Sequence, residues 1–276
     1  MALSINSNIA ALSVQRYLAR STNNLSINYN RLASGLRINS SKDDPAGLSI
    51  STRLTANIRG MNQAITNAND GLSLTQIADE ALSQTVEALQ QIREKAVEAN
   101  TSSLTNTDRN DLNTEVMQLV AEIDRIGNNT DFNNQILLSG GFTNKKFQIG
   151  TDAMQTIQIS IMGAVNSAIG LGVGGTLANV STMANASTTI GLVDTALDSV
   201  TSIRSQLGAF QNRFESIISS LTSGSENLQI ARSHIMDVDV AQEATLLARN
   251  SIIQQAGIAI LAQANLQPKQ VLNLLQ

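Results

Sequence analysis

Apolar residues recur along both halves of the chain at spacings that alternate between three and four residues. In the N-terminal half one series runs Leu54, Ile58, Met61, Ile65, Ala68, Leu72, and others run Leu82, Val86, Leu89 and Leu112, Val116, Leu119, Ile123, Ile126. In the C-terminal half a series extends from Val193 to Ile235, and only Gly224 lacks an apolar group there. A mean spacing of about 3.5 keeps one apolar stripe facing a partner helix. The pattern predicts a mainly α protein built on a long antiparallel helical coiled-coil rod.

The two chain ends carry a related repeat. Ile5, Ile9 and Leu12 lie at helical spacing and are followed by Leu18, Leu25 and Leu32 at intervals of seven; near the C-terminus Leu246, Ile253 and Ile260 are also seven apart, and Leu261 continues the apolar surface. Each end predicts an amphipathic helix with little charge, so the economical arrangement pairs the two ends with each other. We therefore predict an inner domain of paired N- and C-terminal helices formed by residues 1–42 and 237–276.

Residues 43–236 form the predicted outer rod domain. Asp44 and Pro45 are an N-cap followed by proline at the first helical position, which predicts a helix to about Asn100. Gly60 and Gly71 lie off its apolar series and cost about 1 kcal/mol each relative to alanine. Thr105 or Thr107 starts a second helix, and Gly127 is expected to end it.

The residue pattern changes after this helix from helical periodicity to turn and strand signals. Turn residues at 128–131 and at Gly140–Gly141 flank segments with strand character, 142–149 and 156–161, which predicts a small β-hairpin region at about 129–162. Residues from about 163 to 189 are rich in Gly, Ala, Ser, Thr and Asn without charge, and they predict a short variable loop or a shortened outer element.

Charge is scarce throughout the chain. Charged residues make up 14% and aromatic residues 3% of 276, whereas a typical soluble domain is about 25% charged. A polar but rarely ionised surface loses little hydration energy when it is buried against another copy. The net charge of -4 argues against a nucleic-acid partner. Five cations among the first 42 residues favour solvation and helix pairing over binding to anions or membranes.

Several chemistries are excluded by composition. The chain has no cysteine, so it forms no disulfide or thiolate site. Its first residues do not form a signal peptide, and the uncharged segment 250–268 is too polar for membrane insertion. His234 is the only histidine, and the Asp44–Pro45 helix start explains the cluster of charges at 42–44 better than acid–base catalysis does. We expect neither an enzyme nor a bound cofactor or metal.

Short motifs along nearly the whole chain identify a resemblance. The N-terminal half contains Ile5-Asn6-Ser7-Asn8, Leu32-Ala33-Ser34-Gly35-Leu36-Arg37-Ile38-Asn39, Lys42-Asp43-Asp44-Pro45-Ala46-Gly47-Leu48, Asn67-Ala68-Asn69-Asp70-Gly71 and Phe147-Gln148-Ile149-Gly150. The C-terminal half contains Arg204-Ser205-Gln206-Leu207-Gly208-Ala209, Gln211-Asn212-Arg213-Phe214 and Ala262-Gln263-Ala264-Asn265. In this order the motifs resemble bacterial flagellin, in a short form that keeps only the assembly core.

The resemblance implies a structural subunit that self-assembles into the extracellular flagellar filament used for swimming. The ten apolar end positions from Ile5 to Leu261 named above are then the expected assembly residues, and the partner is a helical homopolymer of the same chain. Similar proteins leave the cell through type III export without a cleavable signal peptide. They are held beforehand by an export chaperone on the C-terminal helix, and they meet hook-associated and filament-cap proteins.

The resemblance also implies recognition by an innate Toll-like receptor. The matching positions are Leu89, Gln90, Gln91, Arg93, Glu94 and Lys95, with Glu115 on the next helix. Strongly stimulatory relatives carry arginine in place of Gln91 and leucine in place of Lys95. Loss of a bidentate donor and of an apolar contact weakens such an interface, so we expect reduced recognition.

Two other non-enzymatic readings are open to the sequence. A hook–filament junction protein shares the terminal helices, although the resemblance here extends through the rod and hairpin. A surface-binding module for a polysaccharide or host receptor would need an aromatic-lined groove, and the few aromatic residues form no obvious cluster.

Overall fold

The computed structural model describes the chain at residues 7–165 and 178–274, with side chains placed up to residue 266. Within these ranges it contains five helices and four short strands. The helices are α1 (Ile9–Ser34), α2 (Pro45–Ala99), α3 (Asn106–Asn129), α4 (Met183–Met236) and α5 (Val240–Leu274); the strands are β1 (Asp131–Phe132), β2 (Gln135–Ile136), β3 (Lys145–Gln148) and β4 (Thr156–Ile159). The mainly α fold with long helices is confirmed.

The chain forms two compact units. Residues 1–56 and 227–276 form the end unit, and residues 57–226 form the central unit. The predicted domain boundaries at 42/43 and 236/237 lie at the connectors between helices, whereas these units divide α2 and α4 within their helices. The predicted domain limits themselves stay a prediction.

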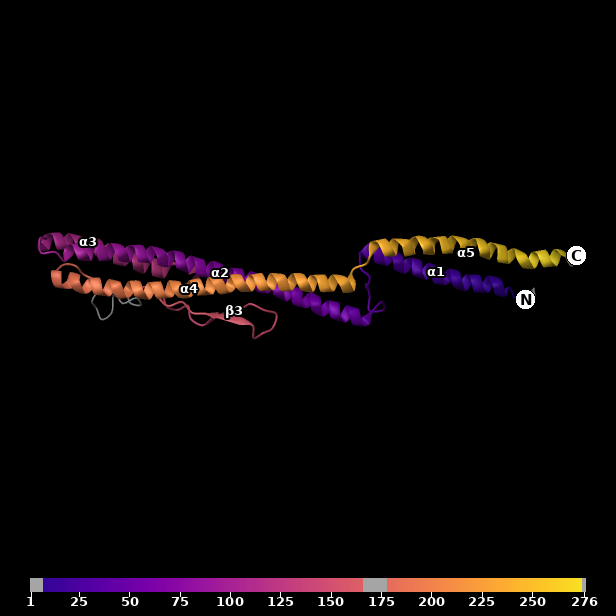
Figure 1. Ribbon diagram of the computed structural model, residues 1–276, viewed down its shortest axis with the longest axis horizontal. Coiled ribbons are helices and arrows are strands. Elements are labelled where there is room, and N and C mark those ends of the chain that lie inside the picture. Colours follow the sequence, from indigo (N-terminus) through magenta and orange to yellow (C-terminus); the bar gives the residue numbers. More distant parts are fainter. Residues whose placement is uncertain (1–6, 166–177, 275–276) are drawn as a thin grey trace. The chain divides into compact units, whose positions relative to one another are not determined.

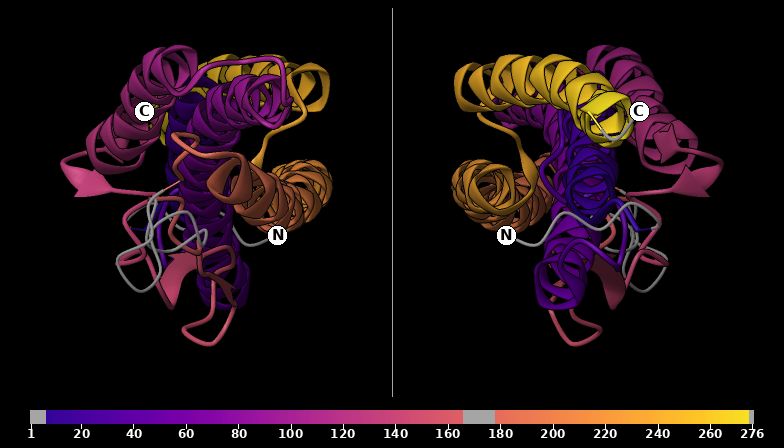
Figure 2. Two further views of the ribbon diagram at one scale, coloured as in Figure 1. Left: turned by 90° about the vertical axis from the view of Figure 1, so that its left-hand side faces the viewer. Right: turned by 90° about the vertical axis from the view of Figure 1, so that its right-hand side faces the viewer.

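In the end unit α1 and α5 lie side by side and antiparallel (Figures 1 and 2). Asn8 at the start of α1 contacts Ala264 late in α5, and Asn28 late in α1 contacts Glu243 at the start of α5. Gly35 ends α1 with a left-handed φ of 71°, which glycine adopts without strain. Its carbonyl accepts a hydrogen bond from the Val238 amide at 3.0 Å, so the two connectors are joined by backbone bonds.

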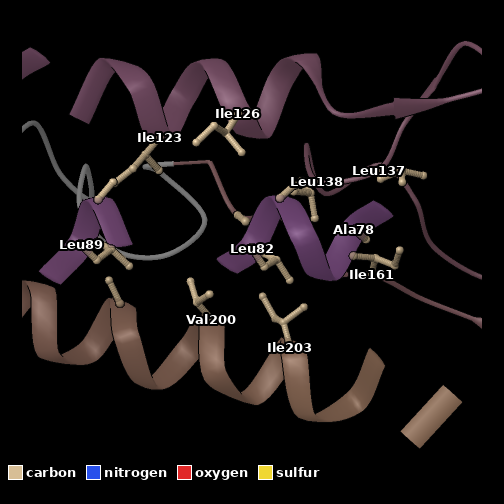
Figure 3. Close-up of a cluster of buried hydrophobic side chains, with 14 of the residues drawn as sticks. Ala78, Leu82, Leu89, Ile123, Ile126, Leu137, Leu138, Ile161, Val200 and Ile203 are labelled. Carbon is tan, nitrogen blue, oxygen red and sulfur yellow. The ribbon is translucent and has the colours of Figure 1, made fainter. Parts of the chain in front are cut away.

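The central unit packs α3 and α4 against α2. Figure 3 shows Leu82 and Leu89 of α2 between Ile123 of α3 and Val200 and Ile203 of α4. All five side chains are buried, and they occur in the apolar series predicted from the sequence. Thr105 caps α3 in a reciprocal capping box with Asp108, as its position before the helix predicts.

Two antiparallel hairpins follow α3. The predicted strands are present, although shorter than expected: β3 pairs with β4 so that Phe147 lies opposite Ile157. The Ile161 amide still donates to the Phe142 carbonyl at 2.8 Å beyond the named strands. Phe147 then meets the ring of Phe214 in α4, with ring centres 6.0 Å apart at 79°. The hairpin is thereby attached to the helices.

Two local predictions were wrong. Gly127 does not end α3, which continues to Asn129; the glycine is buried, and a Cβ there would lie 2.7 Å from Val165 Cγ1, so close packing explains it. The predicted loop at 163–189 is helical from Met183 onward, because the Thr182 hydroxyl accepts from the Asn185 amide and starts α4. Residues 166–177 of that segment lie outside the described part of the chain.

Candidate functional site on the paired chain ends

Polar groups occupy the α1–α5 interface toward the end of the pair where α1 finishes and α5 begins. The Asn28 carboxamide donates to Glu243 Oε1 at 2.6 Å, and the Asn250 carboxamide donates to Asn28 Oδ1 at 3.0 Å. The Ser21 hydroxyl donates to the Asn250 carbonyl at 3.2 Å, and Arg31 lies 3.9 Å from Glu243 Oε2. Asn28, Glu243 and Ser21 are all buried, so their polar groups have lost their hydrogen bonds to water. The bonds between α1 and α5 take the place of those lost bonds.

Small residues allow α5 to approach α1 between this polar cluster and the open ends of the two helices. A Cβ on Gly257 would lie 3.4 Å from Leu18 Cδ1, so the glycine brings the helix close to that leucine. Ala11 and Ala264 are buried toward the open ends of the two helices. The face that α5 turns toward α1 therefore includes Glu243, Asn250, Gly257 and Ala264, which are seven residues apart.

The large apolar residues of the two helices divide between this interface and solvent. Leu25 is buried, and Leu18, Leu32, Leu246 and Leu261 are half-buried. In contrast, Ile9 is 68%, Leu12 57%, Ile253 44% and Ile260 53% exposed. We call these four residues the outer set. Ile5, the remaining predicted assembly residue, lies outside the described residues.

Other apolar residues outside the predicted assembly set share this exposure. They include Tyr17, Ile27 and Tyr29 of α1 and Ile252, Ile258 and Leu266 of α5. These residues could have been found in the sequence, because α5 carries apolar residues on all of its sides. A series of residues seven apart follows only one face of the helix and therefore misses the others. A helix that is apolar on every side is normally buried on every side. Two helices cannot cover each other in this way, so the end unit presents an exposed apolar surface.

A second candidate surface lies on α2 and α3 of the central unit. Leu89 is fully buried there, so the expectation that it faces a receptor was wrong; its place in the apolar series of α2 gave the right environment. Gln90, Gln91, Arg93, Glu94 and Glu115 are exposed, and Lys95 is half-buried.

The two cations of this second surface are paired inside the chain. Lys95 Nζ lies 3.1 Å from Glu115 Oε2, and Arg93 Nε lies 2.8 Å from Asp194 Oδ1 of α4. The hydrogen bond that Lys95 donates to Glu115 raises the pKa of Lys95, and the hydrogen bond that Arg93 donates to Asp194 raises the pKa of Arg93. These cations help to join α2 to its two neighbours.

Together these features describe a helical protein whose paired chain ends expose large apolar side chains. Among the described residues no group of three His, Cys, Asp or Glu side chains could hold a metal ion. None of the helices in the same ranges is long and apolar enough to cross a membrane. The surface suits contact with protein.

Comparison with known families agrees with this class. Residues 5–143 match the bacterial flagellin N-terminal helical region, and residues 190–275 match the bacterial flagellin C-terminal helical region. The chain belongs to the bacterial flagellin family. It is accordingly a structural protein of the extracellular flagellar filament and not an enzyme.

Individual relatives span the whole chain. The flagellin of Halalkalibacterium halodurans is 40% identical over 272 residues, and the flagellin of Bacillus subtilis is 38% identical over 302; in both, the match covers 99% of each chain. The crystal structure of Bacillus cereus flagellin matches 60% of this chain and 94% of its own, with 28% identity and a TM-score of 0.51.

A hook-associated neighbour shares only the fold. A putative flagellar hook-associated protein of Vibrio parahaemolyticus matches 71% of this chain and all of its own, at 17% identity and a TM-score of 0.60. The full-length similarity to flagellins favours the filament subunit over the junction protein.

Proposed function

We propose that this subunit polymerises through the exposed apolar surface of its paired chain ends, with the outer set at the contact between copies. The observation that supports this most directly is the exposure of Ile9, Leu12, Ile253 and Ile260 on two helices that already cover each other. Full burial of such a side chain contributes about 1.5–3 kcal/mol. That gain is available only when copies stack, so the order of the end unit depends on polymerisation.

Ile253→Asp tests the contact. The side chain is half in water in the single subunit, so the substitution leaves the helical content and monodispersity of the subunit unchanged while it places a charge in the contact between copies. Ile253→Leu is the matched control, because it keeps an apolar group of the same volume. Seeded samples are examined by electron microscopy. Filaments from the leucine variant and none from the aspartate variant are expected; normal filaments from both contradict the proposal.

A truncation tests the end pair as a whole. A chain that lacks residues 246–276 loses most of α5 and with it the partner of α1. Seeding should give filaments from the full chain and none from the truncated one. Soluble monomer from both would favour the surface-binding alternative, which glycan-binding assays on disassembled subunits address directly.

The same exposed surface on α5 is where we place an export chaperone before assembly, and its open end is where hook-associated and filament-cap proteins are expected to meet the polymer. The support is chemical: α5 presents Ile252, Ile258 and Leu266 to solvent, and a chaperone that covers them keeps the subunit from aggregating. Co-purification of the family's export chaperone with the full chain, and its loss with the 246–276 truncation, is the expected result.

Recognition by the Toll-like receptor is a second, weaker function of the α2–α3 surface. Gln90 and Gln91 are exposed and offer no cation, and Lys95 is engaged with Glu115 inside the chain. Gln91→Arg with Lys95→Leu supplies a bidentate donor and an apolar contact. Receptor-reporter cells should respond to the double variant at concentrations roughly tenfold lower than to the parent. An unchanged response contradicts recognition through this surface.

A further inference from the structure

The seven-residue repeat of the end pair does not by itself define how α1 and α5 are aligned. On α1 the residues nearest α5 include Ala11, Leu18, Leu25 and Leu32, and on α5 they include Glu243, Asn250, Gly257 and Ala264; both series advance by seven. If α5 slips by seven residues along α1, each series again faces the other. Apolar burial is non-directional, so it discriminates poorly between such alignments.

The polar groups do discriminate between them. Glu243 is only 4% exposed, and its carboxylate meets the Asn28 carboxamide at 2.6 Å and lies 3.9 Å from Arg31. A slip of one heptad in one direction moves Glu243 from beside Arg31 to beside Leu25. A slip in the other direction places it beyond Ser34, where α1 ends. The first slip leaves a buried carboxylate without its cation, which is strongly unfavourable, and the second slip removes the carboxylate from both Asn28 and Arg31.

Asn28 further favours the native alignment over slipped ones, because both the nitrogen and the oxygen of its carboxamide form hydrogen bonds. Its nitrogen donates to Glu243, and its oxygen accepts from Asn250, one heptad further along α5. The side chain therefore lies between two successive positions of the α5 series. We propose that the Asn28–Glu243–Asn250 cluster, with Arg31 beside it, is a register lock that permits only one alignment of α1 and α5.

A register lock matters to assembly because the outer set spans both helices. A slipped pair would shift Ile253 and Ile260 by about 10 Å relative to Ile9 and Leu12, at 1.5 Å per residue. Copies in different registers would then present different surfaces. This step rests on the proposed function, whereas the alignment of the two helices can be measured independently of it.

Disulfide trapping measures the alignment of α1 and α5. The chain has no native cysteine, so only the introduced cysteines can form disulfides. In the described register Leu18 meets Gly257, and Ala11 lies one turn from Asn8, whose side chain donates to the Ala264 carbonyl. The matched pairs are therefore Leu18→Cys with Gly257→Cys and Ala11→Cys with Ala264→Cys. The slipped pairs recombine the same four positions as Ala11 with Gly257 and Leu18 with Ala264, one for each direction of slip.

Each pair is placed in the full chain and in a chain that also carries Asn28→Leu, Glu243→Leu and Asn250→Leu. Well-packed apolar replacements of a buried charged cluster commonly preserve stability, so the triple variant should still pair its ends. Leu25→Ala is the control, because it weakens the same interface without touching the cluster. After a short pulse of oxidant, faster-migrating monomers report bonds within a chain, and dimers report bonds between copies.

With the native cluster, the matched pairs should form at least about tenfold more intrachain disulfide than the slipped pairs, and Leu25→Ala should keep that ratio. In the triple variant the ratio should fall toward one. A ratio that stays high in the triple variant overturns the register lock.

The same samples are seeded for electron microscopy. Fewer or shorter filaments from the triple variant support the role of register in assembly, and unchanged filaments with slipped disulfides overturn that role. If the parent forms no filaments, the proposed function fails, and the disulfide ratio in the soluble chain still decides the register lock: a ratio near one in the parent overturns it.

Discussion

Gly71 of α2 lies directly against the ring of Phe214 of α4. A Cβ on Gly71 would stand 2.6 Å from Phe214 Cζ and about as close to the rest of the ring edge. Phe214 is fully buried and in turn contacts Phe147 of β3. The glycine thus makes room for an aromatic ring that joins two helices and a hairpin.

Gly71→Ala should therefore destabilise the central unit despite the better helix propensity of alanine. Displacing Phe214 costs about 1–3 kcal/mol, which exceeds the helical gain of about 1 kcal/mol. Gly191→Ala in α4 is the matched control, because a Cβ there meets nothing within 4 Å. Urea unfolding should show a lower midpoint for Gly71→Ala and a higher one for Gly191→Ala. Equal shifts would contradict the packing argument.

Arg109 lies near the start of α3, and we expect its side chain to contribute strongly to the stability of the central unit. The buried guanidinium donates to the Ala99 carbonyl at 2.9 Å and the Thr101 carbonyl at 2.6 Å, at the end of α2. Arg109→Met removes these charge-assisted bonds, each worth about 1.5–3 kcal/mol. Arg109→Lys should recover part of the loss, since lysine keeps the charge without the planar fork. If the two variants have equal free energies of unfolding, the hydrogen bonds of the Arg109 guanidinium do not stabilise the fold as described.

Acid should loosen the start of α3 through Asp108. Hydrogen bonds from the Thr105 amide and hydroxyl lower the pKa of Asp108 below its ordinary 3.8. A lowered folded-state pKa means that the stabilisation is complete above 3.8 and is lost as the pH falls through the folded-state value. The protection of amides in the first turn of α3, measured as the exchange rate relative to the intrinsic rate at each pH, should fall below pH 3.8 in the parent. In Asp108→Asn this protection should be lower at the start and change less across that window; parallel profiles would refute the assignment.

Two ion pairs between α2 and α4 should differ in strength although their lengths agree. Arg204–Asp79 and Arg93–Asp194 both measure 2.8 Å, but the first pair is 36% and 34% exposed and the second 47% and 50%. Exposed pairs contribute about 0.2–1 kcal/mol and are screened by salt. Double-mutant cycles with glutamine and asparagine should give the larger coupling for Arg204–Asp79. The opposite order would show that burial does not control these pairs.

Much of the fold could be predicted because heptads and caps are local signals. The apolar series gave α2 and α4, Asp44 and Thr105 marked helix starts, and the strand segments located β3 and β4. The turn between β1 and β2 was missed: Asn133 and Asn134 adopt left-handed φ values of 50° and 59°. Several asparagines precede them, and each could supply a turn, so composition did not fix the position.

The candidate site was harder to predict, because it depends on which side of α5 meets α1. The seven-residue series predicted Ile253 and Ile260 as assembly residues, but it did not predict that the interface with α1 uses Asn250 and Gly257. Small and polar residues give little hydrophobic signal even when they are buried. Leu89 is the opposite case. Its place in the apolar series correctly predicted that it is buried, whereas the resemblance placed it on the receptor-facing surface.

The pairing of Asn8 with Ala264 joins residues 256 positions apart. Contacts of such high sequence separation form late, because a long loop must close before they yield any stabilisation. The α2–α3 turn around Arg109 closes over ten residues, so it can form while most of the chain is still absent. The end unit therefore forms only after α5 has been synthesised, and a chain interrupted before Ala264 lacks the complete α1–α5 pair.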